Sequence, residues 1–250
     1  MKIAVCISGQ PRNYEQGYYE LKKWFLDKYD CDVYIHAWKD LESEFKTSHP
    51  FAQSKTHKFT EEDYQNILDL YQPKDYYFQS PIIFDENNIR GPLLGYKLND
   101  LLSAGYSRQA TFDLVEESGM EYDLVIRTRF DLMFSNYISP ECIFLKDLSL
   151  LDPNKLNAFS YLPIEDRKSE VDDLFAVSSQ RIARIYADYF SYMLYYIYVE
   201  EDYVTWLKDL VVNPDPICAE SLLKYHLIKN EVDIEYIPSL TNHFTAHIIR

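Results

Sequence analysis

The first part of the chain divides into apolar blocks separated by polar residues. Lys2–Ile7 is followed at once by polar residues, a pattern typical of a buried strand that runs into a loop. Glu15–Tyr29 has apolar residues at helical spacing, and Asp32–Trp38 is a second, mostly apolar run. A strand, a helix and a strand within about forty residues form the βαβ unit of parallel sheets. The pattern therefore predicts a mostly parallel sheet.

The rest of the chain continues this alternation. Thr60–Asp63 resembles a capping box, so we expect a helix that begins there and ends before Pro73. Ser80–Gly95 is rich in proline, glycine and asparagine and is expected to be a loop. Further strands are predicted at Asp75–Gln79, Leu124–Thr128, Ala158–Leu162, Leu174–Val177 and Asp233–Ile237. Further helices are predicted at Leu98–Glu117, Arg181–Tyr198, Asp202–Val211 and Ala219–Lys229, which together give the α/β class.

Length and composition fit one globular domain. The 250 residues are enough for one large core and short for two. No apolar run is long enough to span a bilayer, and the first residues turn polar too soon for a signal peptide. The four cysteines are scattered, without a CxxC pair, and Cys6 and Cys31 lie in or beside apolar runs. We therefore expect reduced cysteines and a cytoplasmic protein.

The net charge narrows the classes of ligand. The formal charge of −15 argues against nucleic acid and an anionic membrane surface, because both are held mainly by lysine and arginine. An acidic protein can still bind one phosphorylated ligand if a metal ion or a few arginines meet the phosphates. The 23 tyrosines offer aromatic surface suited to stacking against sugars, although many of them simply pack in the core.

Two predicted loops stand where an α/β sheet binds its ligands, at the carboxyl ends of the strands. Ser8–Arg12 leaves the first predicted strand at that end, and Arg127–Asp131 leaves a central one. Asp30 and Asp32 form a DxD pattern, but they stand where a strand begins, so we expect an ordinary surface pair at the opposite edge. The motifs GxxxxGK[ST], GxGxxG and HExxH, which mark other nucleotide and metal sites, are absent from the sequence.

Four segments carry a family resemblance: Ile3–Arg12 with Asp32–Trp38, Tyr122–Leu132, Asp172–Ser178, and Glu220–Leu227. In this order they resemble a group of glycosyltransferases found in bacteria, algae and large DNA viruses. The resemblance implies a single GT-A-like domain, a nucleotide-sugar donor, a glycan or other hydroxyl acceptor, and a divalent cation, Mn²⁺ or Mg²⁺. Residues 1–135 would hold the donor, and 136–250 would form the acceptor side. The metal-binding DxD motif of GT-A enzymes is here Arg129-Phe130-Asp131, with a single carboxylate.

Asp131 is the first candidate for a metal ligand, unless it is merely a turn residue after a strand. A hard cation that bridges a diphosphate needs only one or two carboxylates, because waters and phosphate oxygens complete its shell. His243 and His247 would complete that shell, close over the phosphates or belong to a solvated tail. Arg127 and Arg129, two apart on an extended chain, face the same way. They either meet the pyrophosphate in place of the missing carboxylate or pair with neighbouring acids.

Further donor contacts are expected at the ends of the first two strands and in the helix before Arg127: Ser8, Gly9, Gln10, Arg12, His36, Trp38, Ser107 and Gln109. Arg12 and the backbone amides of Gly9 and Gln10 would hold the base or the phosphates, and Gly9 would allow close approach of the backbone. The alternative is a turn that binds no ligand. The histidine and tryptophan would flank the ribose or base, unless they are core residues. The last two positions follow from the family resemblance.

Three acids are candidates for catalysis. Asp172 and Asp173 stand between a charged loop and a predicted strand, where one of them would act as base on an acceptor hydroxyl. The alternative is a solvated loop with paired charges. Glu220 begins a predicted helix, where a carboxylate also complements the helix dipole.

Three functions are compatible with these residues. The first is a glycosyltransferase that uses a nucleotide-sugar donor. The second is a catalytically inactive GT-A-like domain that binds a glycan or a protein partner, which the single carboxylate and the many tyrosines favour. The third is a nucleotide-sugar hydrolase or phosphotransferase, which would share the donor site but lack an acceptor cleft.

Overall fold

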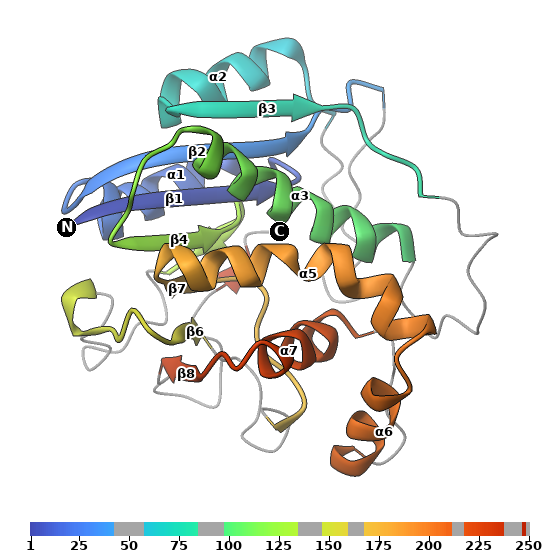
Figure 1. Cartoon of the computed structure of the whole chain (residues 1–250). Helices are drawn as coiled ribbons and strands as arrows, with labels where there is room; N and C mark the ends of the chain where they lie inside the picture. The colour runs from blue at the N-terminus through green and yellow to red at the C-terminus, as the bar shows by residue number, and fades with distance from the viewer. Residues whose placement is uncertain are drawn as a thin grey trace.

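A computed structural model describes residues 1–42, 58–84, 98–134, 147–159, 168–211, 218–237 and 247–248. Within these ranges the chain folds around a seven-stranded sheet of order β3-β2-β1-β4-β7-β6-β8 (Figure 1). The strands of this sheet are β1 (Lys2–Gly9), β2 (Asp30–Trp38), β3 (Asp75–Gln79), β4 (Leu124–Thr128), β6 (Leu156–Phe159), β7 (Ala176–Ser178) and β8 (Ile234–Ile237).

All strands of the central sheet except β7 point the same way. The neighbours β3, β2, β1 and β4 are parallel, β7 is antiparallel to both β4 and β6, and β6 is parallel to β8. The α/β class with a mostly parallel sheet is thereby confirmed, as is the expectation that β2, β1 and β4 are neighbours. Because β7 is reversed, the residues that precede it lie at the same edge as the residues that follow β4.

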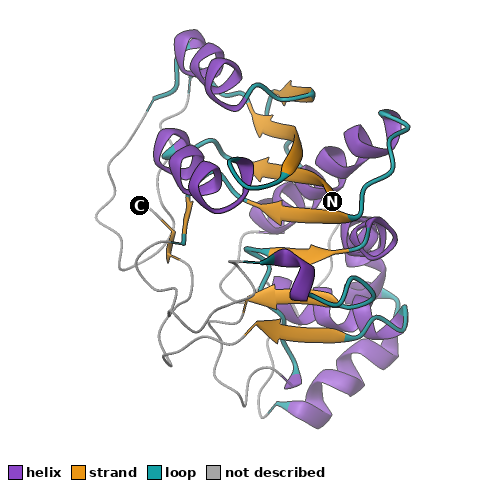
Figure 2. Cartoon of the chain, turned by 90° about the vertical axis from the view of Figure 1, so that its left-hand side faces the viewer, coloured by secondary structure: helices purple, strands orange, loops and turns teal. Residues whose placement is uncertain are grey.

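Helices cover both faces of the sheet (Figures 1 and 2). One face carries α1 (Tyr14–Leu21) and α2 (Glu61–Tyr71), and the other carries α3 (Leu98–Glu117) and α5 (Gln180–Tyr198). Two further helices, α6 (Glu201–Leu210) and α7 (Ala219–Lys229), pack against α5. Among the described helices, none combines the length and the apolar character needed to cross a membrane.

The alternation of side chains along β1 explains this layering. Ile3, Val5 and Ile7 point into the core shared with α1 and α2, and all three are fully buried. Ala4 and Cys6 point the other way, into a core formed with α3 and α5. Because Ala4 and Cys6 are small, α3 and α5 can pack closely against this face of β1.

Most predicted elements are present, with small differences in their bounds. The strand predicted at Ala158–Leu162 begins earlier, at Leu156, and two further differences have local reasons. The capping box at Thr60–Asp63 is present, and α3 has the predicted bounds. The predicted helix at Glu15–Tyr29 is instead α1 followed by a π-helical turn, Lys22–Leu26, after which β2 begins. The strand predicted from Leu174 begins at Ala176, because the amide of Leu174 donates instead to the Asp172 carboxylate in a turn (2.7 Å).

A second, two-stranded ribbon was not predicted. It pairs β5 (Leu132–Met133), directly after Asp131, with β9 (His247–Ile248) near the end of the chain, apart from the central sheet (Figure 2). Strands of two residues are too short to show an alternating pattern. The pairing nevertheless places His247 beside the chain segment that follows Asp131, so at this position the tail is part of the fold.

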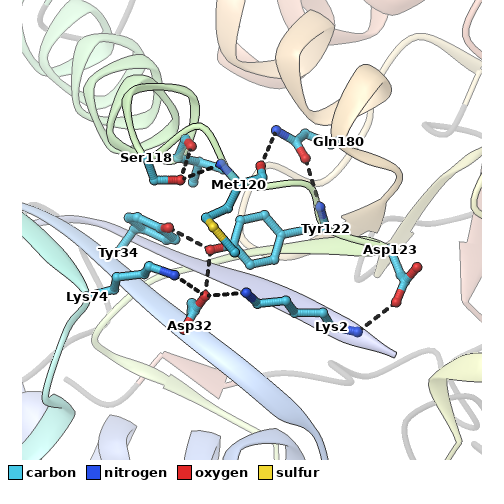
Figure 3. Close-up of polar contacts among 10 residues, drawn as sticks. Lys2, Asp32, Tyr34, Lys74, Ser118, Met120, Tyr122, Asp123 and Gln180 are labelled. Atoms are coloured by element: carbon cyan, nitrogen blue, oxygen red, sulfur yellow. Dashed lines mark hydrogen bonds and ion pairs between the residues drawn. The ribbon is translucent and has the colours of Figure 1, made fainter.

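Asp32, the second aspartate of the DxD pattern at the start of β2, is part of a hydrogen-bonded network at the amino edge of the sheet (Figure 3). The Asp32 carboxylate accepts hydrogen bonds from Lys74 and from the Tyr122 hydroxyl, both at 2.7 Å, and Lys2 lies 3.4 Å away. The Tyr122 hydroxyl also meets that of Tyr34 at 2.6 Å. Burial alone would raise the pKa of Asp32, but the hydrogen bonds from Lys74 and Tyr122 lower it. As expected, this aspartate is part of an ordinary ion-paired group.

Gly17 lets α1 approach the loop after β4. A methyl group added at Gly17 would overlap the backbone carbonyl of Phe130, which cannot move without shifting the loop that holds Asp131. Gly17→Ala is therefore expected to lower the free energy of unfolding by about 1–3 kcal/mol, the usual cost of overpacking. Urea unfolding would measure this, with the exposed Gln16→Ala on the same helix as control. Equal stability of the two variants would contradict the close approach.

Candidate active site

The two loops predicted to bind the donor meet at the carboxyl edge of the sheet. One guanidinium nitrogen of Arg12, after β1, lies 3.4 Å from a carboxylate oxygen of Asp131, after β4. This confirms the expected meeting of the two loops. The backbone turns at Gly9, the last residue of β1, whose φ of 110° other residues rarely adopt. Ser8 is buried at the end of the strand, and Gln10 is exposed.

Arg129 and Asp131 form a two-pronged ion pair. Arg129 Nε donates to Asp131 Oδ1 at 2.8 Å, and Nη2 donates to Oδ2 at 2.9 Å. The Asp131 side chain is only 2% exposed, whereas those of Arg12 and Arg129 are 23% and 25% exposed. Both carboxylate oxygens therefore accept a hydrogen bond, and the two arginine side chains are the parts of this group that are partly exposed.

A second ion pair lies deeper, between α3 and the turn before β7. The Arg108 guanidinium donates to the Asp173 carboxylate, and Arg127 donates to the Asp173 backbone carbonyl. The Tyr186 hydroxyl on α5 donates to the same carbonyl at 3.3 Å. Burial alone would raise the pKa of Asp173, but Arg108, Arg127 and Arg129 together lower it. Asp173 is thus an ionised partner of buried arginines.

In the other two candidate acids, Asp172 and Glu220, the pKa is raised rather than lowered. Burial raises the pKa of Asp172 well above its usual range, and Asp173 and Glu220 add to the effect. Burial and then the nearby charge of Asp173 also raise the pKa of Glu220. Asp172 is 2% exposed and its carboxylate accepts from the Leu174 amide, whereas Glu220 is partly exposed. The three acids predicted from sequence therefore lie together but in different protonation environments.

His36 lies near the end of β2, within an aromatic and polar cluster. Its two ring nitrogens meet the Ser107 hydroxyl at 2.7 Å and the Gln79 side chain at 3.2 Å. Trp38 stacks on Tyr106 with ring centroids 5.6 Å apart. The structure therefore joins three predicted donor residues, the histidine, the tryptophan and the serine. The fourth, Gln109, instead accepts a hydrogen bond from Ser191 on α5 (3.2 Å), away from this cluster.

The buried histidine makes stability depend on pH. Burial lowers the pKa of His36 from 6.5 to about 4. Between these values only the unfolded chain takes up the proton, so stability is fully present above pH 6.5 and falls as the pH drops towards 4. One pKa unit is worth about 1.4 kcal/mol, so this group is expected to remove up to roughly 3 kcal/mol. Urea unfolding across this range tests it: His36→Gln should lack this component, and an unchanged profile would contradict it.

Arg108 and Tyr186 were not predicted as site residues. Arg108 lies on the apolar stripe of α3, with Leu101, Gly105 and Phe112 at helical spacing, and it is 4% exposed. A charged residue inside an apolar stripe is the signal that sequence analysis could have used. Arg108 and Arg127 also line a cavity of about 20 Å³ between the sheet, α3 and α5, with room for roughly one water molecule.

The divalent cation implied by the family resemblance stays a prediction. Asp131 directs both oxygens to Arg129, and no group of three acidic, histidine or cysteine side chains in the described ranges is placed to share a metal ion. The second metal candidate, His243, lies outside the described residues. The described residues therefore do not by themselves fit a cation.

Comparison with known proteins finds similarity in fold only. No family model matches the sequence, and no curated protein does. Mouse xyloside xylosyltransferase 1 is similar at TM-score 0.42 and 8% identity, covering 94% of this chain and 83% of that one. Glycosyltransferase GlyE of Streptococcus pneumoniae gives 0.38 and 11% (94% and 44%), and a nucleoside-diphosphate-sugar pyrophosphorylase of Vibrio cholerae gives 0.39 and 10% (94% and 90%). Such TM-scores define neither activity nor ligand here.

Proposed function

We propose that this chain is a glycosyltransferase, which transfers a sugar from a nucleotide-sugar donor to a hydroxyl group of a glycan or another acceptor. One observation carries the proposal. Arginines that reach solvent, Arg12 and Arg129, lie at the same sheet edge as a group of buried or half-buried acids, Asp172, Asp173 and Glu220. Cationic groups suit a diphosphate, and an acid with a raised pKa suits a proton acceptor.

In the proposed reaction, the donor phosphates lie against the guanidinium groups and the sugar faces the acids. The acceptor oxygen forms a bond to the anomeric carbon, and the bond from that carbon to the phosphate oxygen breaks. The acceptor proton passes to a carboxylate, and the nucleoside diphosphate leaves with the electron pair of the broken bond. Fixed guanidinium groups stabilise the negative charge that develops on the leaving phosphate.

Of the three acids, Glu220 best suits the role of base. Asp173 is held ionised by Arg108, which makes it a weak proton acceptor. Asp172 is almost fully buried. Glu220 is partly exposed at the first turn of α7, and its raised pKa brings it closer to the neutral range where a base works best.

The proposal is tested by the products formed from a panel of donors. The full chain is incubated with UDP-, GDP- and dTDP-sugars and a set of glycan acceptors, and both released nucleoside diphosphate and glycosylated acceptor are measured. Acceptor-dependent release with a glycosylated product is the expected result. Release without an acceptor would indicate a hydrolase. Binding of nucleotide-sugars or glycans without any release would indicate the inactive binding domain.

A further inference from the structure

We infer that the guanidinium groups of Arg12 and Arg129, held in place by Asp131, bind the donor phosphates without the help of a divalent cation. The inference rests on the proposed function and assigns its phosphate-binding chemistry. It makes Asp131 a positioning residue, in place of the metal ligand implied by the family resemblance.

The order of exposure supports this assignment. Asp131 is 2% exposed and lies behind two arginine side chains that are about a quarter exposed, at 23% and 25%. A ligand at this edge can therefore reach the arginine side chains, whereas the carboxylate is almost fully covered. The two-pronged pair with Asp131 fixes the plane of Arg129, and a planar fork of N–H donors matches the oxygens of a phosphate.

The local balance of charge also favours an anion. Among the described residues four arginines gather here, Arg12, Arg108, Arg127 and Arg129. Arg12 and Arg129 contact the Asp131 carboxylate, Arg108 contacts that of Asp173, and Arg127 donates to the Asp173 carbonyl. Burial raises the pKa of Asp172 well above its usual range, which reduces the negative charge that this acid adds. The whole chain carries a formal charge of −15, so a positive group at one edge is a local feature rather than a reflection of composition.

The same contacts disfavour a cation on Asp131. Each carboxylate oxygen already accepts a hydrogen bond from Arg129 at 2.8–2.9 Å, and Arg12 lies 3.4 Å from one of them. A divalent ion bound to this carboxylate would have to displace a two-pronged pair and would then sit beside two positive groups. Like charges at such distances repel strongly where solvent is partly excluded.

The inference is tested by binding measurements on the full chain with inorganic pyrophosphate, UDP and GDP, in excess EDTA and in excess Mn²⁺. Calorimetry is expected to show binding in EDTA of an affinity similar to that in Mn²⁺. Arg129→Gln and Arg12→Gln are each expected to weaken binding by roughly tenfold to a hundredfold, because each removes charge-assisted hydrogen bonds. Asp131→Asn is expected to weaken it far less, since the asparagine oxygen still accepts from Arg129 and a competing negative charge is gone.

Two further variants keep the test decisive. Arg181→Gln, on the exposed start of α5, removes the same charge away from the site and is expected to leave affinity unchanged. Arg129→Lys keeps the charge but loses the fork, so its affinity should fall between those of the wild type and Arg129→Gln. Circular dichroism shows whether each variant is folded.

The outcomes separate the inference from the proposed function. Binding that appears only with Mn²⁺ and disappears in Asp131→Asn would overturn the inference and leave the glycosyltransferase proposal standing. Equal affinity of wild type and both glutamine variants would overturn it as well. If neither pyrophosphate nor a nucleotide binds in either condition, the proposed function fails together with the inference.

Discussion

Asp173→Asn is expected to lower the free energy of unfolding by about 3 kcal/mol, at the lower end of the 3–5 kcal/mol typical when one partner of a buried ion pair is removed. The Arg108 side chain is 3% exposed and pairs with the Asp173 carboxylate, whose side chain is 15% exposed. The asparagine keeps a hydrogen bond but leaves the arginine charge buried without its counter-charge. Urea unfolding at neutral pH would measure the loss.

A surface pair of the same kind provides the control. Asp113 pairs with Arg184 between α3 and α5, but these side chains are 44% and 28% exposed. Asp113→Asn is therefore expected to change stability by less than about 1 kcal/mol. Arg108→Met combined with Asp173→Asn should recover part of the loss, because no unpaired charge is left in the interior. Equal losses in Asp173→Asn and Asp113→Asn would show that the inner pair is solvated.

Glu220→Gln is expected to lower the rate of sugar transfer by roughly 10²–10⁴-fold while leaving nucleotide affinity within a few-fold, because a base acts on the acceptor rather than on the donor. In the wild type, the rate should fall as the pH drops through the raised pKa of Glu220, since only the ionised carboxylate accepts a proton. The measurement is the transfer rate of wild type and variant across pH, with a donor and acceptor found in the panel.

Glu62→Gln is the matched control for this experiment. Glu62 is an exposed residue in the first turn of α2, as Glu220 is in the first turn of α7, so both changes remove a favourable interaction with a helix dipole. Only Glu220 lies at the site. A similar small effect of both substitutions would show that Glu220 only interacts with the helix dipole and is not the base. A large loss in Asp172→Asn instead would move the base to that residue.

The fold could be predicted from the sequence where its elements are long. The strands β1, β2 and β4 are marked by apolar runs, so their place as neighbours in the sheet was predicted. The bounds of β4 and α3 agree with the prediction, whereas β1 continues two residues further, to Gly9, and β2 begins two residues earlier, at Asp30. The π-helical turn after α1 and the pairing of β5 with β9 involve too few residues for any periodicity to show. Such short pieces are set by contacts between distant parts of the chain.

The candidate site was predicted as far as sheet geometry alone determines it. Ligands of such sheets bind at the carboxyl ends of the strands, so the loops that carry Arg12 and Asp131 were expected to meet. The contact between the two side chains confirms this. Ser107 and Gln109 were expected together, but residues two apart on a helix point roughly 200° away from each other. The pairing of Arg108 with Asp173 was not predicted, because the partner of a charged residue in an apolar stripe depends on how α3 crosses the sheet.

The reversed direction of β7 has a consequence for any attempt to divide the chain. Arg127 on β4 pairs in register with Ala176 on β7, and the arginine itself donates to Asp173 just before that strand. A cut near residue 135, between the predicted donor and acceptor halves, would place the paired strands β4 and β7, and the site residues beside them, on different fragments. The first fragment would carry an open strand edge and an arginine without its carbonyl partner. Two such fragments would regain the arginine–acid cluster only if β4 and β7 pair again. Their reassociation would therefore show whether the site has formed.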